Sequence, residues 1–355
     1  MNRHQNMILH GILSQHKVDK TFVTTWSIPS DDFTLAWPTA SLAGYSFDYD
    51  IDWGDGSPVE NIKAPTGVSH TFSNAGIYKV KVKGVMPRWT INNGAMKDYL
   101  IGVDNWGDVG FAYFANMFQG CSNLEYIKGK VVLSGNAGGM LRDCTVFNHP
   151  IGHWDVGAVT NMNRMFCDSP FNQDIGNWNV GNVKDMNRMF YDSPFNQDIG
   201  NWNVGNVEDM NRMFYDSPFN QDIGNWNVGN VEDMSYMFRN SPFNQDIGNW
   251  NVGVVTNMNW MFCDSPFNQD IGNWNVGNVK DMSNMFRASP FNQDIGNWNV
   301  GNVTDMSYMF FNASAFNQDL SGWCVSKIPT RPTNFDSGAT AWVLPNSRPI
   351  WGTCP

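Results

Sequence analysis

The chain has 355 residues, of which 42% are hydrophobic and 14% aromatic, with 16 Trp and 20 Met. This much large apolar surface excludes a disordered chain and indicates a folded protein with a sizeable core. The formal net charge of -11, the absence of a basic run and the absence of a long apolar run argue against nucleic acid as a partner and against a transmembrane segment.

Residues 1–30 are expected to form an N-terminal extension. Its apolar piece, Met7, Ile8 and Leu9, is interrupted by His10 and Gly11 and is too short for the core of a signal peptide. A signal peptide is therefore not evident, and export has to be inferred from other features.

Residues 31–95 alternate with period two, which predicts half-buried antiparallel strands. Phe47, Tyr49, Ile51 and Trp53 face one way, and the acidic residues between them face the other. Tight turns are expected at residues 54–56 and 74–76. The sequence predicts a small β-sandwich here, in which Asp52 and Asp55 either form the turn or bind Ca²⁺.

Residues 96–146 are expected to form degenerate capping coils, residues 147–325 a solenoid of 24-residue repeats, and residues 326–355 a C-terminal cap. The repeats are marked by a phenylalanine in each coil, at Phe147, Phe171, Phe195, Phe219, Phe243, Phe267, Phe291 and Phe316. Cys324 and Cys354 flank the cap segment, and they either form a disulfide or remain free thiols.

Each coil has two groups of apolar residues. In one coil Val183, Met186, Met189 and Phe190 have the spacing of a short helix. The other group, which includes Phe171, lies in a stretch rich in Asn and Gly that favours a short strand. The expected fold class is therefore α+β: an antiparallel β-sandwich followed by a solenoid with one short strand and one short helix per coil.

Two sets of motifs resemble known families. Residues 52–56 (DWGDG), 70–72 (HTF) and 76–80 (GIYKV) resemble a PKD-like domain, and the repeated FNQDI, WNV and MF elements resemble the BspA-type leucine-rich-repeat surface proteins of bacteria. The resemblance implies a surface-displayed or secreted binding and adhesion protein without catalytic residues. Most coils here have a Ser–Pro pair, such as Ser193 and Pro194, where that family often has a Cys shortly after the MF element.

One acidic column recurs at the same coil position and is a candidate calcium site, because hard cations prefer clustered carboxylates. Its members are Asp174, Asp198, Asp222, Asp246, Asp270 and Asp294, and Asp319 extends the column. The alternative is that each carboxylate accepts backbone N–H groups in a turn. A second column, Asp185, Asp209, Asp233, Asp281 and Asp305, is expected in the first turn of each helix.

Other candidate sites also have two interpretations. The Asn and Gln columns offer hydrogen bonds to sugars or water, or else satisfy one another between coils. His149 and His153, near Cys144 and Cys167, form either a zinc site or irregular positions of a boundary coil.

The coils differ from one another at a few positions that are candidate ligand contacts, because exposed Arg, Tyr and Trp make good binding anchors. The column chosen as the ligand-binding site contains Arg188, Arg212, Tyr236, Trp260 and Tyr308, with Asn284 between the last two. A neighbouring column contains Tyr191, Tyr215, Arg239, Cys263, Arg287 and Phe311, and a third contains Lys184, Glu208, Glu232, Thr256, Lys280 and Thr304. The alternative is unconstrained drift on a solvated face.

The sequence therefore predicts a non-enzymatic protein, extracellular or at the cell surface, whose solenoid binds a protein or glycan ligand on another cell or matrix. No cofactor is expected apart from the calcium of the acidic column. The alternatives are a polysaccharide-processing enzyme on a parallel β-solenoid and a calcium-dependent structural spacer.

Overall fold

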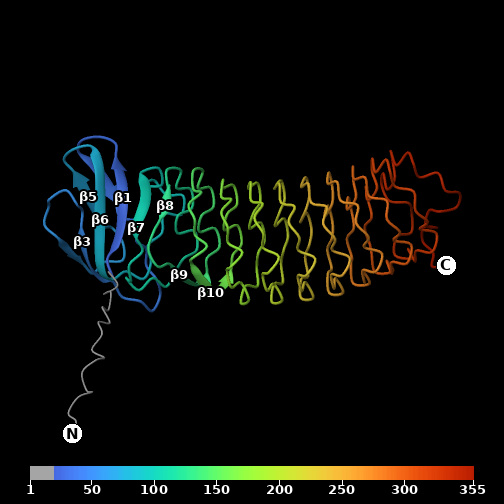
Figure 1. Cartoon of the computed structure of the whole chain (residues 1–355), viewed down its shortest axis with the longest axis horizontal. Coiled ribbons are helices and arrows are strands. Elements are labelled where there is room, and N and C mark those ends of the chain that lie inside the picture. The colour runs from blue at the N-terminus through green and yellow to red at the C-terminus, as the bar shows by residue number, and fades with distance from the viewer. Residues whose placement is uncertain (1–19) are drawn as a thin grey trace, which may run out of the picture.

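The computed structural model describes residues 20–355, and most of the expected N-terminal extension, including its apolar piece, lies outside the described residues. A β-sheet domain at one end is continuous with a long stack of coils (Figure 1). The strands are β1 (Phe22–Ile28), β2 (Phe33–Ala36), β3 (Asp48–Asp52), β4 (Glu60–Ile62), β5 (Ser69–Phe72), β6 (Gly76–Val85), β7 (Leu100–Asn105), β8 (Tyr126–Ile127), β9 (Val132–Asn136) and β10 (Asp155–Asn161).

The sheet domain contains a six-stranded sheet in the order β4-β3-β6-β1-β7-β8 and a two-stranded sheet, β2-β5. Strand β1 comes from the segment expected to be an extension, yet it lies centrally and pairs antiparallel with both β6 and β7. Strand β8 pairs with β7 in parallel, which is also the direction in which the coils pair. The sheet therefore passes directly into the coil stack.

The core of this domain is aromatic. Tyr49 and Ile51 on β3 are buried, together with Phe47 and Trp53, as the period-two pattern predicts. Trp37 lies at the centre, with ring-centroid distances of 5.8 Å to Trp53 and 6.0 Å to Trp26. Large rings of this kind bury much apolar area per residue and fix the packing geometry.

The predicted helix in each coil is wrong, and so is the α+β fold class. No helix is present in residues 20–355, and the described chain is all β and turns. In residues 185–192 the N–H groups of Met186, Arg188 and Phe190 donate to carbonyls of the next coil at 2.9–3.0 Å, whereas a helix would use carbonyls of its own segment.

Backbone angles explain why the helix does not form. Arg188 has a φ of 53° and Asp192 a φ of 48°, and one left-handed residue ends a right-handed helix. Around them the chain makes successive tight turns, such as Met189 N–H to Met186 C=O at 3.1 Å and Tyr191 N–H to Arg188 C=O at 3.2 Å. Turns that return every three residues place apolar side chains on one side just as a helix would, which is why the spacing was misleading.

Identical apolar side chains form buried ladders along the stack, in keeping with a solenoid of repeats. The Phe, Ile, Val and Met columns are 0–1% exposed from one regular coil to the next, and the Trp column is 3–4% exposed. Each Trp indole also links two coils: Trp202 Nε1 donates to the Ile175 carbonyl of the preceding coil at 3.1 Å. Burial and hydrogen bonding thus both depend on the neighbouring coil.

The two ends of the stack are closed. At the C-terminal end Phe335 and Trp342 pack edge-on against Phe310, with centroid distances of 5.4 Å and 5.6 Å. Of the two possibilities for the cap cysteines, the structure has the Cys324–Cys354 disulfide.

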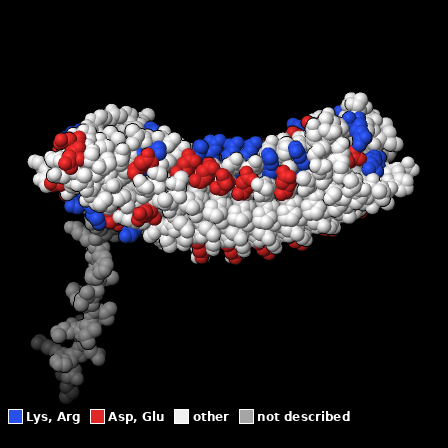
Figure 2. Space-filling model, turned by 90° about the horizontal axis from the view of Figure 1, so that it is seen from above, with Lys and Arg blue, Asp and Glu red and all other residues white. Residues whose placement is uncertain are grey.

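The stack is curved, and stacked rings measure the curvature. The ring spacing is 4.8 Å between Tyr191 and Tyr215, and it widens to 6.5 Å between Trp250 and Trp274. The Tyr and Trp positions lie about half a turn apart in the 24-residue coil, so they face opposite sides. Residues 184–192 and their equivalents therefore lie on the concave side, and residues 174–179 on the convex side. Figure 2 shows charged side chains in neighbouring rows along the hollowed edge of the stack.

Candidate functional site

The residues chosen from sequence as ligand contacts lie in one column on the concave side. We call two adjacent columns the concave ladder. The first column is Arg164, Arg188, Arg212, Tyr236, Trp260, Asn284 and Tyr308, and the second is Cys167, Tyr191, Tyr215, Arg239, Cys263, Arg287 and Phe311. All five predicted ligand contacts belong to the first column.

The concave ladder is held together by stacking between rings and guanidinium groups. Tyr236 and Trp260 stack with a centroid distance of 5.7 Å, and the Arg212 guanidinium lies 4.1 Å from the Tyr236 ring centre. Arg239 lies 4.4 Å from the Trp260 ring, and Arg287 lies 5.2 Å from it. Cation–π contacts of this kind restrain long arginine side chains.

The first column has a strained backbone. Its seven residues have φ values between 53° and 59°, the left-handed region, although they include Tyr and Trp. Gly or Asn would occupy this region at lower energy, and large side chains cost on the order of 1 kcal/mol or more. The coil geometry therefore imposes this backbone conformation whichever side chain occupies the position.

Charges on this face are only partly compensated. In the described chain, Arg164, Arg188 and Arg212 have no carboxylate within ion-pair distance, and neither do Arg239 and Arg287. Burial, and then the positive charges of Arg212 and Arg164, lower the pKa of Arg188. A parallel column contains Asp168, Asp192, Asp216 and Asp264, and burial followed by repulsion from its two neighbours raises the pKa of Asp192.

The candidate calcium column lies on the convex side and is not assembled into a metal site. The Asp174 carboxylate accepts the Gly176 N–H at 2.8 Å, and its counterparts make the same bond at 2.9 Å. Within residues 20–355 no group of three or more His, Cys, Asp or Glu side chains is placed to hold a metal ion. The structure therefore matches the turn interpretation of this column.

The second acidic column has the same kind of bond. Asp185 accepts the Asn187 N–H at 2.9 Å, so it closes a turn and does not begin a helix. Burial, with neighbouring Asp185 and Asp233, raises the pKa of Asp209.

The remaining polar candidates are also structural. The Asn172 side chain accepts from the Asn196 N–H and the Gln197 amide, both at 3.0 Å, so these ladders tie coil to coil. Cys144 is buried and its thiol contacts the Phe118 carbonyl at 3.1 Å, while burial raises its pKa far from thiolate chemistry. The structure does not bring it together with the two candidate histidines in a zinc-binding group.

In the sheet domain, Asp55 and Asp52 form the turn. The Asp52 carboxylate accepts the Gly54 N–H at 2.9 Å, and Asp55 contacts His70 Nε2 at 2.7 Å. Burial pushes the pKa of Asp55 upward, but hydrogen bonds from Ser57 and His70 outweigh it and lower the pKa to about 2.

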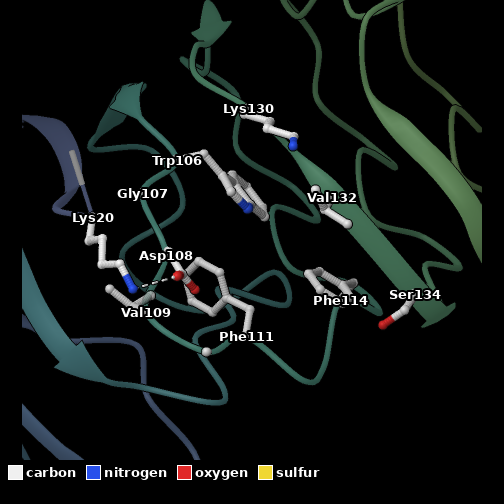
Figure 3. A pocket seen from close by; sticks show the side chains of 11 residues that line it. Lys20, Trp106, Gly107, Asp108, Val109, Phe111, Phe114, Lys130, Val132 and Ser134 are labelled. Carbon is white, nitrogen blue, oxygen red and sulfur yellow. Dashed lines mark ion pairs between the residues drawn. The ribbon is translucent and has the colours of Figure 1, made fainter. Parts of the chain in front are cut away.

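Sequence reasoning missed a pocket of about 520 Å³ where the sheet domain meets the first coils (Figure 3). Its lining includes Trp106, Phe111 and Phe114, which follow β7, and Lys130, which precedes β9. Asp108 is the carboxylate in the lining and is ion-paired with Lys20 at 3.3 Å. No periodic signal marks these residues, because they converge from separate segments.

The fold and the site together define an all-β solenoid repeat protein with a sheet domain at one end. The chain belongs to the family described as "Mycoplasma protein of unknown function, DUF285", whose model matches residues 82–193, 112–218, 135–245, 170–266 and 239–342. No curated protein and no solved structure matches the chain.

The family finding corrects the earlier resemblances. No leucine-rich-repeat or PKD model matches the chain, and the coils lack the helix expected of them. The assignments to a BspA-type leucine-rich-repeat protein and to a PKD-like domain are therefore wrong. Short turn motifs such as DWGDG arise wherever Asp and Gly close a turn, so they identify a turn more reliably than a family.

None of the described residues forms a helix that is long and apolar enough to cross a membrane.

Proposed function

We propose that this protein is a binding protein, displayed at the cell surface or secreted, and that its concave ladder is the recognition surface. The observation that carries the proposal is the position of the sequence differences between coils. Residues 171–181 (FNQDIGNWNVG) recur without change in six successive coils, whereas the differences fall almost entirely on residues 184–192 and their equivalents.

Exposure alone does not account for this distribution. Asp174, Asn177 and Asn179 on the convex side are exposed, yet they are identical in the six coils. The varied positions Arg188 and Tyr191 are only partly exposed. Drift on a solvated face would alter the more exposed convex positions first, so the pattern favours a varied face that serves recognition.

Two further features support binding over catalysis and an extracellular location. The pocket lining contains a single carboxylate, Asp108, whereas glycoside hydrolysis commonly needs two. The Cys324–Cys354 disulfide suits an oxidising compartment.

The test uses ligands selected from randomised peptide libraries and from glycan arrays against the full chain. The face variant is Tyr236→Asn with Trp260→Asn, since Asn284 already occupies this column in its left-handed conformation. The control is Asn225→Ser with Asn249→Ser, which alters the convex side of the same two coils.

We expect the face variant to weaken binding at least about tenfold, and the control to change it by less than about twofold. Ligands that bind the face variant and the wild type equally would contradict the proposal. Release of reducing ends from any polysaccharide would instead establish the enzymatic alternative.

A further inference from the structure

We propose, resting on the binding function above, that the concave ladder recognises an extended polypeptide segment by its carboxylates, which Arg212, Arg239 and Arg287 receive. Three observations carry this inference: oriented guanidinium groups without a carboxylate partner, ring faces that are already covered, and a hollowed shape flanked by acidic side chains.

The guanidinium groups are positioned before any ligand arrives. Arg287 lies between two rings, 5.2 Å from Trp260 and 5.3 Å from Phe311, and Arg239 contacts Tyr215 at 5.2 Å as well as Trp260. A planar guanidinium held on a ring face keeps its N–H edge for a carboxylate, which it binds through two parallel hydrogen bonds. Because the side chains are already restrained, little further entropy is lost on binding.

The covered ring faces argue against sugars as the ligand. The Tyr236 ring has Arg212 and Trp260 packed against it, and the Tyr215 ring has Tyr191 at 4.8 Å and Arg239. A sugar ring stacks on an open aromatic face, and the central rings of the ladder offer mainly their edges. Ring edges, tyrosine hydroxyls and arginines are typical of protein-binding surfaces.

The first column of the concave ladder also contains a buried acceptor that suits a peptide backbone. Asn284 is 7% exposed, and its Oδ1 is buried without a hydrogen-bond partner. A buried unpaired acceptor is costly, so a donor is expected near it. A polypeptide supplies N–H groups next to its carboxylates, and an acidic polysaccharide does not.

Shape and charge limit the partner further. The ladder lies on the hollowed edge of the stack, which a flat surface would bridge without entering (Figure 2). The parallel Asp168, Asp192 and Asp216 column would repel a densely charged polyanion. An extended chain with carboxylates on one side fits both restrictions.

The experiment measures fluorescence anisotropy with three probes: a labelled peptide of alternating Glu and Ser, the matching Lys and Ser peptide, and labelled polygalacturonate. The variant is Arg239→Gln with Arg287→Gln. The matched control is Lys83→Gln, which removes a positive charge from an exposed position of β6 in the sheet domain, away from the coils. Arg287→Lys retains the charge but loses the planar fork, and melting curves verify that all variants fold.

We expect the Glu–Ser peptide to bind more tightly than either other probe, and its binding to weaken as ionic strength rises. The double variant should lose at least about tenfold in affinity and Arg287→Lys less, with the control within about twofold. Equal loss in the control, or equally tight binding of polygalacturonate, would overturn the inference.

This outcome can be separated from failure of the binding function. If the Glu–Ser peptide does not bind while library-selected ligands still depend on Tyr236 and Trp260, the carboxylate inference is wrong and the binding function stands. If no selected ligand depends on those two residues, the proposed function fails.

Discussion

Equivalent residues of successive coils share one backbone conformation. The column of the concave ladder with left-handed backbone shows that this conformation cannot always be recognised from the residue type. Gly and Asn usually mark such backbone, but here Arg, Tyr and Trp occupy it. The apolar spacing of residues 183–190 therefore predicted a helix. By contrast, the buried columns and the turn-forming aspartates could be predicted, because both depend on side-chain chemistry that repeats every 24 residues.

We expect Asp209→Asn to stabilise the protein at neutral pH. Burial and two neighbouring carboxylates raise the pKa of Asp209, so ionising it disfavours the folded state, and Asn257 already occupies this column. The stability that the protonated group contributes is present below its unfolded pKa and lost as pH rises through the folded value. Melting temperatures at neutral and acidic pH should show a gain for the variant only at the higher pH.

For the Asp55 carboxylate we expect the opposite dependence of stability on pH. Its pKa is lowered to about 2, so its contribution to stability is present above the unfolded value near 4 and is lost as the pH falls toward 2. Asp55→Asn should therefore lower the stability of the sheet domain at neutral pH and have little effect near pH 2. A variant whose deficit does not depend on pH would contradict this account.

At the scale of elements, features that depend on pairing between distant segments of the chain were the ones that could not be predicted. The alternation within β3 and β6 was evident from sequence, but the central position of β1 was not, because it depends on partners 48 or more residues away. The pocket lined by Trp106, Phe111 and Phe114 was missed for the same reason. Inter-coil ladders were easier to predict, since identical neighbours imply their own pairing.

The terminal cap depends on its disulfide. Reduction, or the Cys324→Ser and Cys354→Ser pair, frees a loop of 30 residues and should cost about 3–4 kcal/mol. Thermal unfolding with and without reductant measures the loss. The other four cysteines are unpaired and buried, so the serine pair should abolish the effect of reductant.

At the scale of the whole molecule, the coils are interchangeable. We therefore expect the protein to tolerate the removal of one coil. Deleting residues 219–242 joins equivalent positions and should leave a folded, shorter stack, because every coil offers the same ladders and hydrogen bonds. Small-angle scattering should show the maximum dimension reduced by about one coil spacing.

The control for this deletion removes residues 219–230, half a coil. The remaining half of that coil would then be out of register with the neighbouring coils, so that its apolar side chains meet exposed positions. We therefore expect part of the stack to unfold. If both deletions were equally well folded, the register between coils would not determine stability.

The central claim is that partners are held on the concave side of the stack. The most direct test places a photo-crosslinking benzophenone side chain at Tyr236 on that side, or at Asn225 on the convex side of the same coil, and adds a selected ligand. The account predicts a crosslinked product from position 236 and none from position 225. Efficient crosslinking from position 225, with none from position 236, would contradict it.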